Sequence, residues 1–212
     1  SAMNMQAFGE QIDIHGGGRD LIFPHHENEI AQTESLTGKQ FAKFWIHNGL
    51  IKVNGQKMSK SLGNSLLLAD LLKEYHPEVI KFALLQTNYR GDINVTDALF
   101  PEAEKHMLSF HRVLAEAKKA GVPCDGTDEG IDSAFDEAMD DDFNTAKALA
   151  DLFGIFKTAS RMLREKDFDG ANAVLGQVKK TYSLLGLFRA DSEAFVARVE
   201  AKHAASVPAD IA

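Results

Sequence analysis

The apolar residues recur with the 3.6-residue spacing of an α-helix from about residue 65 to residue 203, but not before residue 65. Pro77 and Pro101 suit the first turn of a helix, and Gly121 and Gly186 suit the position after a last turn. We expect Thr96 to cap one of these helices, in which Pro101 marks either the true start or a kink. The pattern predicts helices over residues 66–75, 77–87, 97–120, 130–140, 144–166 and 170–185, and a weaker amphipathic segment over 192–203.

The first 64 residues instead combine short apolar segments with glycines and turn signals. Residues 12–23 predict a short strand, a glycine loop and a second apolar segment, and Pro24 is expected to open a helix that stops at Gly38. Residues 44–53 predict a strand, and Asn54-Gly55 predicts a hairpin turn because both residues tolerate positive φ. These strands are too few to complete a sheet. We therefore expect that an N-terminal portion of the domain is missing. The fold class is α/β followed by an all-α bundle.

Composition and charge exclude several classes of function. The chain has a formal net charge of −8, and residues 1–95 hold nine Lys and Arg against ten Asp and Glu. The acidic excess therefore lies in the helical portion, which excludes sequence-independent binding to nucleic acid over the whole surface. Cys124 is the only cysteine, so a disulfide framework is excluded and a reducing, cytoplasmic setting is expected. No apolar run approaches the ~20 residues of a membrane span.

Two stretches are candidates for lining a nucleotide or amino-acid pocket. In "HGGGRD", which begins at His15, the bare backbone of Gly16, Gly17 and Gly18 can approach a sugar or phosphate closely, and Asp20 can accept from ribose hydroxyls. A glycine triplet alone is more often a flexible turn. In "FWIHNG", Trp45 and His47 can line an adenine or amino-acid pocket, although each taken singly is more often a core residue.

The stretch "PHHENE" is a candidate metal site. His25 and Glu29 are four residues apart, so on a helix they share one face and can share a zinc ion. His26 and Glu27 then point elsewhere and are expected to serve packing or to support the ligands. A solvent-facing pair is the commoner meaning of this spacing, and two ligands do not complete a zinc site.

The stretch "KMSKS" follows the expected hairpin turn. Lys57 and Lys60 are three residues apart and can converge on one polyphosphate, with hydroxyls from Ser59 and Ser61. Each charge-assisted hydrogen bond contributes roughly 1.5–3 kcal/mol. The alternative is a solvated basic loop, and composition alone does not reject it.

The order of these motifs resembles the cysteinyl-tRNA synthetases, a family of class I aminoacyl-tRNA synthetases. The resemblance runs through "SAMN", "DIHGGGRDLIFPHHENEIAQ", "FWIHNG", "KMSKSLGN", "NYR" and "MDDDFNTAKAL" and covers most of residues 1–188. It implies a partial Rossmann-type catalytic domain followed by a helical bundle. By this resemblance, residues 1–64 are the C-terminal part of the catalytic domain, 65–95 a helical stem-contact junction, 96–188 a tRNA-contacting bundle, and 189–212 the start of a truncated C-terminal region.

The resemblance also implies the chemistry. Lys60, assisted by Lys57, would stabilise the pyrophosphate that leaves when L-cysteine reacts with ATP and Mg²⁺ to form cysteinyl-adenylate, before transfer to cysteine tRNA. The family holds one Zn²⁺ with two cysteines, a histidine and a glutamate, and His25 and Glu29 match the last two. One family cysteine would immediately precede Ser1, so we expect a fragment that is inactive alone and monomeric. Leu67, where many relatives have threonine, is expected to cap its helix weakly.

Two other functions compete with this interpretation. A related ATP-dependent ligase joins cysteine to an amino sugar in mycothiol synthesis, but such relatives tend to depart after "PHHE", so "PHHENEIAQ" favours the synthetase. The helical half could instead be a non-catalytic tRNA-binding module. A helical domain with a decorative basic loop does not account for the joint order of the motifs.

Overall fold

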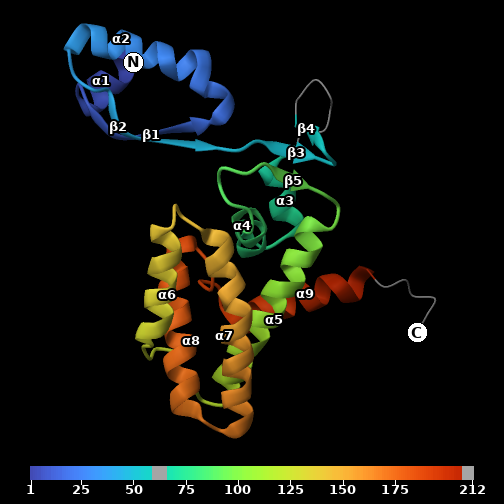
Figure 1. The fold of residues 1–212 in the computed structure, drawn as a ribbon. Coiled ribbons are helices and arrows are strands. Elements are labelled where there is room, and N and C mark those ends of the chain that lie inside the picture. Colours follow the sequence, from blue (N-terminus) through green and yellow to red (C-terminus); the bar gives the residue numbers. More distant parts are fainter. Residues whose placement is uncertain (59–65, 207–212) are drawn as a thin grey trace. The chain divides into compact units, whose positions relative to one another are not determined.

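The computed structural model describes residues 1–58 and 66–206 (Figure 1). The chain forms two compact units. Unit 1 consists of Ser1–Leu62 and Tyr89–Val95, and unit 2 consists of Gly63–Asn88 and Thr96–Ala212. No helix in the described part of the chain is long and apolar enough to span a membrane.

Unit 1 begins with a short helix and a two-stranded parallel sheet. Its elements in order are α1 (Ala2–Phe8), β1 (Ile12–Gly18), η1 (Arg19–Leu21), η2 (Ile22–His26), α2 (Glu27–Thr37) and β2 (Ala42–Asn48). Strands β1 and β2 pair in parallel from Ile12 opposite Ala42 to Gly18 opposite Asn48. Helix α2 is the crossover between the two strands, as a parallel connection requires.

A second sheet of three short strands completes unit 1. Strands β3 (Ile51–Val53), β4 (Gln56–Lys57) and β5 (Ile93–Val95) lie in the order β4-β3-β5. Strands β3 and β4 are antiparallel, and the turn between them has φ 49° at Asn54 and 80° at Gly55. The predicted hairpin is therefore confirmed. Strand β5 returns from much later in the chain and pairs with β3 in parallel.

Two local predictions for unit 1 are wrong. The glycine triplet is not a loop: Gly16, Gly17 and Gly18 belong to β1 and pair with the end of β2. The helix expected from Pro24 begins at Glu27, because Phe23 has extended dihedrals and Pro24 belongs to the separate short element η2. The predicted stop at Gly38 is confirmed by its left-handed conformation.

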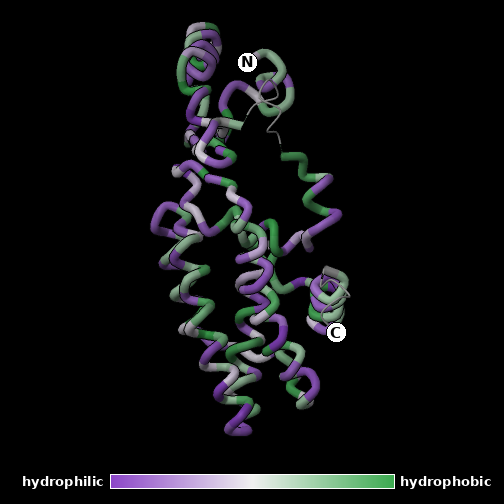
Figure 2. Tube along the Cα trace, turned by 90° about the vertical axis from the view of Figure 1, so that its right-hand side faces the viewer, coloured by the Kyte–Doolittle hydropathy of each residue, from purple (hydrophilic) through white to green (hydrophobic). Residues whose placement is uncertain are grey.

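All the regular secondary structure in the described part of unit 2 is helical. Its elements are α3 (Leu68–Glu74), α4 (Pro77–Leu85), α5 (Leu99–Lys119), α6 (Glu129–Asp140), α7 (Thr145–Glu165), α8 (Phe168–Tyr182), η4 (Ser183–Leu185) and α9 (Ser192–Ser206). Figure 2 shows green and purple residues alternating along these helices, which is the amphipathic pattern that the sequence predicted. The buried faces form a core rich in phenylalanine, in which Phe110 stacks on Phe156 at a centroid distance of 4.6 Å.

Helix ends in unit 2 follow local chemistry at most positions. Asp128, Asn144 and Asp167 accept backbone N–H groups of the first turns of α6, α7 and α8. Leu67 makes no side-chain cap for α3, as expected. Thr96 does not cap α5, because the helix begins at Leu99 after Ala98.

Pro101 in α5 resolves the alternative left by the sequence. It lies in the first turn of the helix, two residues after Leu99, where its missing N–H group breaks no helical hydrogen bond. Helix α5 therefore begins at Leu99, two residues before Pro101, and continues to Lys119.

A buried carboxylate joins three segments of unit 2. Glu78 on α4 is 4% exposed and accepts the N–H groups of Phe188, Arg189 and Ala190 at 3.0, 2.9 and 2.8 Å. Its Oε2 atom also lies 3.0 Å from Nε2 of His111 on α5. Burial alone would raise the pKa of Glu78, but these hydrogen bonds outweigh it and hold the pKa below its ordinary value.

Helix α9 packs antiparallel against α5. Phe195 and Val199 are buried, and the Phe195 ring stacks on His111 at 3.9 Å. Ionic contacts flank this seam; they join Lys118 to Asp191 and Glu193, Arg112 to Glu200, and Lys202 to Glu104. Residues 192–206 thus form a full helix of unit 2, where the sequence predicted only a weak amphipathic segment over 192–203.

The two units also divide the chain differently from the predicted domain boundaries. The expected junction over residues 65–95 is split, because Tyr89–Val95 belongs to unit 1. The reason is the pairing of β5 with β3. The paired residues are about forty positions apart, so no local sequence pattern predicts this contact. Residues 63–88, which include α3 and α4, belong to unit 2.

Candidate functional site

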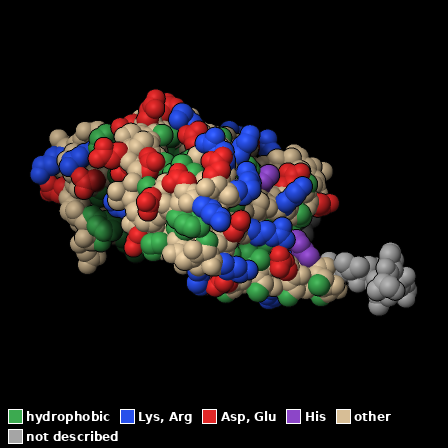
Figure 3. Space-filling model, turned by 90° about the horizontal axis from the view of Figure 1, so that it is seen from below, with side chains coloured by type: hydrophobic (Ala, Val, Ile, Leu, Met, Phe, Trp, Pro, Cys, Tyr) green, Lys and Arg blue, Asp and Glu red, His purple; other side chains and the backbone are tan. Residues whose placement is uncertain are grey.

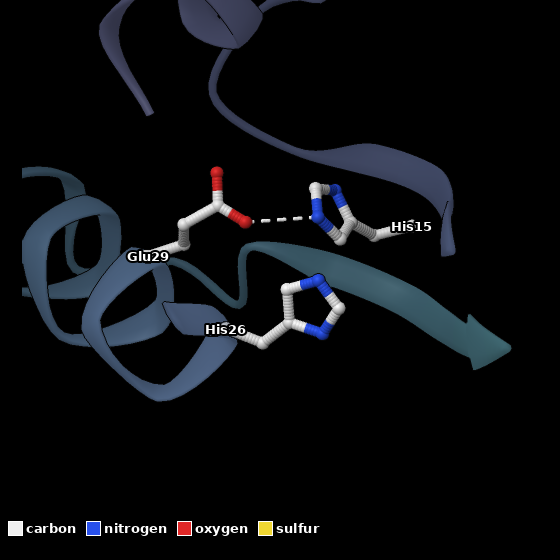
Figure 4. Close-up of side chains that lie close together, drawn as sticks. All are labelled: His15, His26 and Glu29. Carbon is white, nitrogen blue, oxygen red and sulfur yellow. Dashed lines mark ion pairs between the residues drawn. The ribbon is translucent and has the colours of Figure 1, made fainter. Parts of the chain in front are cut away.

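Side chains from β1 and the η2–α2 segment of unit 1 converge on Glu29 (Figure 4). Nε2 of His15 lies 2.9 Å from Oε2 of Glu29, and Nε2 of His25 lies 3.8 Å from the same oxygen. One potential ligand atom from each of His15, His26 and Glu29 lies within 4.8 Å of the other two. The predicted pair of His25 and Glu29 is therefore close, but His15 is closer and His26 does not point elsewhere as expected.

His26 is the buried member of this cluster. The residue is 3% exposed, and its Nδ1 atom lies 2.8 Å from Nε2 of His47. The pKa of His26 is lowered from its ordinary value, mainly by burial and to a smaller extent by the neighbouring imidazoles of His15 and His47. The ring planes of Trp45 and His47 are nearly parallel, 9° apart, and Trp45 also lies 4.8 Å from His15. Trp45 and His47, singled out in the sequence, thus line the imidazole cluster.

The donor atoms suit a zinc ion. Oε2 of Glu29 is buried and makes no hydrogen bond of good geometry, although the imidazole of His15 forms an ion-pair contact with it. A buried carboxylate oxygen without such a bond is costly unless a cation or another donor meets it. Imidazole nitrogen and carboxylate oxygen are ordinary zinc ligands, so the donor set of His15, His26 and Glu29 suits such an ion by its chemistry. The Nε2 atom of His25 lies farther from Glu29, at 3.8 Å.

The sequence motif groups His15 with the glycines and not with Glu29. The signal that would have joined them is the parallel pairing of β1 and β2, since the α2 crossover that carries Glu29 packs beside these strands. Spacing along the chain gives no such signal, because fourteen positions separate the two residues.

The glycine triplet lets the imidazole cluster come close to the backbone. A Cβ atom on Gly17 would lie 2.9 Å from Cε1 of His26, and one on Gly18 would lie 2.6 Å from Oδ1 of Asp20. Gly16 is less restricted, at 3.4 Å from the carbonyl oxygen of Ile46. The absence of a side chain is therefore a packing requirement at Gly17, whereas at Gly18 the end of the Asp20 side chain can move aside.

The lysine-rich stretch is described only in part. Lys57 ends β4 and pairs with Lys52 across the hairpin. Ser59, Lys60 and Ser61 lie outside the described residues. The hairpin arm that leads into the stretch is thus present as predicted.

Two family models match the chain. The catalytic domain of class I (C) tRNA synthetases matches residues 1–105, and the DALR domain matches residues 134–189. The LeuRS of Agrobacterium radiobacter K84, solved in a ternary complex with tRNA and LeuAMS, has a similar fold, with a TM-score of 0.60 at 19% identity over 92% of this chain and 28% of that one. These findings confirm the predicted fold class, and they define the chain as a class I aminoacyl-tRNA synthetase sequence.

The curated relatives narrow the family further. The cysteine--tRNA ligase of Geobacter sulfurreducens is 43% identical over 100% of this chain and 47% of its own length. That of Syntrophotalea carbinolica is 44% identical over 92% of this chain and 44% of its own length. The chain belongs to the cysteinyl-tRNA synthetase family, and it spans about half the length of the curated relatives it matches.

Proposed function

We propose that this chain works as part of a cysteine--tRNA ligase, which activates L-cysteine with ATP to form cysteinyl-adenylate and release pyrophosphate, and then transfers the cysteinyl group to cysteine tRNA with release of AMP. The observation that carries the proposal is the 43% identity to such a ligase over the entire chain. The cluster around Glu29 supports it, because that cluster lies within the residues matched by the catalytic-domain model.

In this function the lysine-rich stretch acts on phosphate. The cysteine carboxylate attacks the α-phosphate of ATP, and negative charge moves onto the departing pyrophosphate. Lys60, with Lys57 assisting, meets that charge, and the hydroxyls of Ser59 and Ser61 donate to phosphate oxygens. Mg²⁺ accompanies ATP.

The β1 segment is proposed to receive the rest of the nucleotide. His15, with the backbone of Gly16, Gly17 and Gly18, lies along the ATP, and Asp20 accepts from ribose hydroxyls. The end of strand β1 fits this role because its backbone carries no side chains at three consecutive positions.

His25 and Glu29 are proposed to hold a zinc ion together with ligands from other parts of the ligase. Zinc, when bound, would coordinate the thiolate of cysteine far better than the hydroxyl of serine. A pocket that relied on size alone would separate two such similar substrates by only about 10–200-fold. His15 stands 2.9 Å from Glu29 and helps to fix the orientation of that carboxylate.

Replacing His25 by alanine in the full-length ligase that carries this sequence is expected to release the metal. Removing one first-sphere ligand takes away a zinc bond, so metal content should fall well below one ion per chain, and discrimination of cysteine from serine should decline at least tenfold. Metal analysis of the purified protein and amino-acid-dependent ATP–pyrophosphate exchange measure the two effects. His203→Ala, which removes an exposed imidazole in unit 2, is the matched control. Stoichiometric zinc retained by His25→Ala would exclude His25 as a ligand.

Residues 65–188, most of which belong to the helical unit, are proposed to contact tRNA. The protein is proposed to be a cytoplasmic monomer. The DALR-domain match within unit 2 supports the tRNA contact. Lys and Arg side chains are interspersed with Asp and Glu on the face seen in Figure 3. Such a mixed surface fits a local, oriented contact with tRNA better than general attraction to nucleic acid.

The choice of acceptor tests the proposed function against its nearest enzyme rival. The full-length ligase should transfer radiolabelled cysteine to cysteine tRNA and not to glucosaminyl-inositol. Transfer to the amino sugar alone would assign the protein to the mycothiol-type ligases. Binding of cysteine tRNA in a gel shift, with no adenylate formed by the full-length protein, would instead indicate a non-catalytic tRNA-binding module.

A further inference from the structure

Asp92 is the meeting point of three segments of unit 1. Its carboxylate accepts from Nη2 of Arg19, which lies 2.8 Å from Oδ1 and 2.9 Å from Oδ2. Nζ of Lys52 lies 2.8 Å from Oδ2, and the N–H group of Leu50 donates to Oδ1 at 2.9 Å. Arg19 directly follows the glycine triplet, and Lys52 lies on β3, so one carboxylate joins both motif-bearing segments.

The backbone around Asp92 is held tightly against the start of β3. A Cβ atom on Gly49 would lie 2.0 Å from the carbonyl oxygen of Gly91, so only glycine fits at position 49. The N–H group of Gly49 donates to the carbonyl of Tyr89 at 2.7 Å, and that of Ile93 donates to the carbonyl of Leu50 at 2.9 Å. These contacts fix where the Asp92 carboxylate can reach.

The same segment also holds the far end of the hairpin. Oδ1 of Asn94 accepts the N–H group of Gly55 at 2.8 Å, and the carbonyl of Val95 accepts the N–H group of Asn54 at 3.1 Å. Residues 89–95 therefore support the hairpin at its base through Asp92 and at its turn through Asn94. The arm beyond this turn leads directly into the lysine-rich stretch.

The charge balance at this point requires a carboxylate. Two cations, Arg19 and Lys52, meet at one residue, and a neutral side chain there would leave them to repel each other. The hydrogen bonds from Lys52 and Leu50 and the charge of Arg19 hold the pKa of Asp92 at about 2, so it is ionised throughout the neutral range. The Arg19 and Lys52 side chains are 49% and 40% exposed, so salt is expected to weaken the contact.

We propose that Asp92 is a positioning residue of the ligase, which couples the glycine triplet to the β3–β4 hairpin and so sets where the lysine-rich stretch meets the nucleotide. The proposal rests on the proposed function for its catalytic consequence, but the coupling itself is a property of unit 1. Asp92 acts through Arg19 and Lys52 and need not touch substrate.

Hydrogen–deuterium exchange on the 212-residue chain tests the coupling directly. Asp92→Asn keeps the shape and an acceptor for Leu50 but removes the charge, so amides of residues 16–19 and 50–57 should exchange roughly three- to tenfold faster. Arg19→Met should also accelerate exchange in the hairpin, and this effect should vanish in the Asp92→Asn background. Persistence of the Arg19→Met effect in that background, or an unchanged hairpin in Asp92→Asn, would overturn the coupling.

The catalytic consequence is measured in the full-length ligase. Asp92→Asn should raise the KM for ATP and lower kcat for pyrophosphate exchange severalfold, while the KM for cysteine stays unchanged. Asp92→Glu, which restores the charge, should recover part of the loss, as a merely structural defect would not. Asp13→Asn breaks an exposed ion pair with Lys43 in the same unit and serves as the control.

The two parts of the proposal fail separately. If the unmodified ligase gives no cysteine-dependent exchange, the proposed function fails and the deuterium-exchange cycle alone decides the role of Asp92. If the ligase is active and Asp92→Asn behaves as Asp13→Asn does, the positioning role is wrong while the proposed function stands.

Discussion

Lys60→Ala in the full-length ligase is expected to slow cysteinyl-adenylate formation on the order of 100-fold with little change in the KM for cysteine. A preorganised cation that meets the leaving pyrophosphate stabilises the transition state more than the bound substrate, so its loss appears in kcat. Lys57→Ala should have the same sign and a smaller size, because Lys57 is proposed to assist. Cysteine-dependent ATP–pyrophosphate exchange measures both variants.

The control for charge is Lys43→Ala. Lys43 is an exposed cation of unit 1 that pairs with Asp13, so this variant makes the same change in net charge away from the lysine-rich stretch. Its exchange rate should equal that of the unmodified ligase. Unchanged exchange in Lys60→Ala would remove the phosphate role from this stretch.

Glu78→Gln is expected to lower the free energy of unfolding of unit 2 by about 3–5 kcal/mol. The substitution keeps the volume of the side chain but places an amide where an ionised carboxylate accepts three backbone N–H groups and faces His111. At least one buried donor then loses its acceptor, and the segment between η4 and α9 loses its anchor. Urea unfolding followed by circular dichroism at 222 nm reports on unit 2, because most of the described helices lie there.

The sign of the pH dependence follows from the lowered pKa of Glu78. A carboxyl whose pKa is lower in the folded state contributes stability above its unfolded pKa, and that stability is lost as pH falls through the folded pKa. Unit 2 should therefore lose stability in acid below the ordinary carboxyl range, and Glu78→Gln should show a flatter acid limb.

Glu200→Gln is the comparison for this prediction. Glu200 pairs with Arg112 at 2.8 Å, but both side chains are more than half exposed, so its loss should cost only about 0–1 kcal/mol. Equal destabilisation by the two substitutions would mean that the buried network around Glu78 does not anchor α9.

The helical unit could be predicted from the sequence because its signals are local. Pro77 at the first position of α4, Gly121 after α5 and Gly186 after η4 all lie where the pattern placed them. A helix satisfies its backbone within a few residues, so a window of the sequence contains most of the information. The prediction that Thr96 caps α5 is wrong. The backbone carbonyl of Thr96, and not its side chain, accepts the N–H group of Leu99 in the turn before the helix.

The candidate site could be predicted only in part, because its geometry depends on long-range pairing. The spacing of His25 and Glu29 identified two members of the cluster, and Asn54-Gly55 identified the hairpin. The approach of His15 to Glu29 depends on how β1, β2 and the α2 crossover pack, and that of Asp92 to Arg19 depends on the return of β5 to β3. Residues 73 positions apart in the chain meet in that ion pair, which no short-range period encodes.

Discrimination between cysteine and serine is the sharpest test of a zinc-dependent cysteine--tRNA ligase. In ATP–pyrophosphate exchange by the full-length ligase, L-cysteine should support a rapid signal and L-serine should support one more than about 200-fold weaker, beyond what size and shape alone provide. Removal of zinc by a chelator should reduce this ratio. A signal of equal size with both amino acids in the zinc-loaded protein, or none with cysteine, would contradict the account.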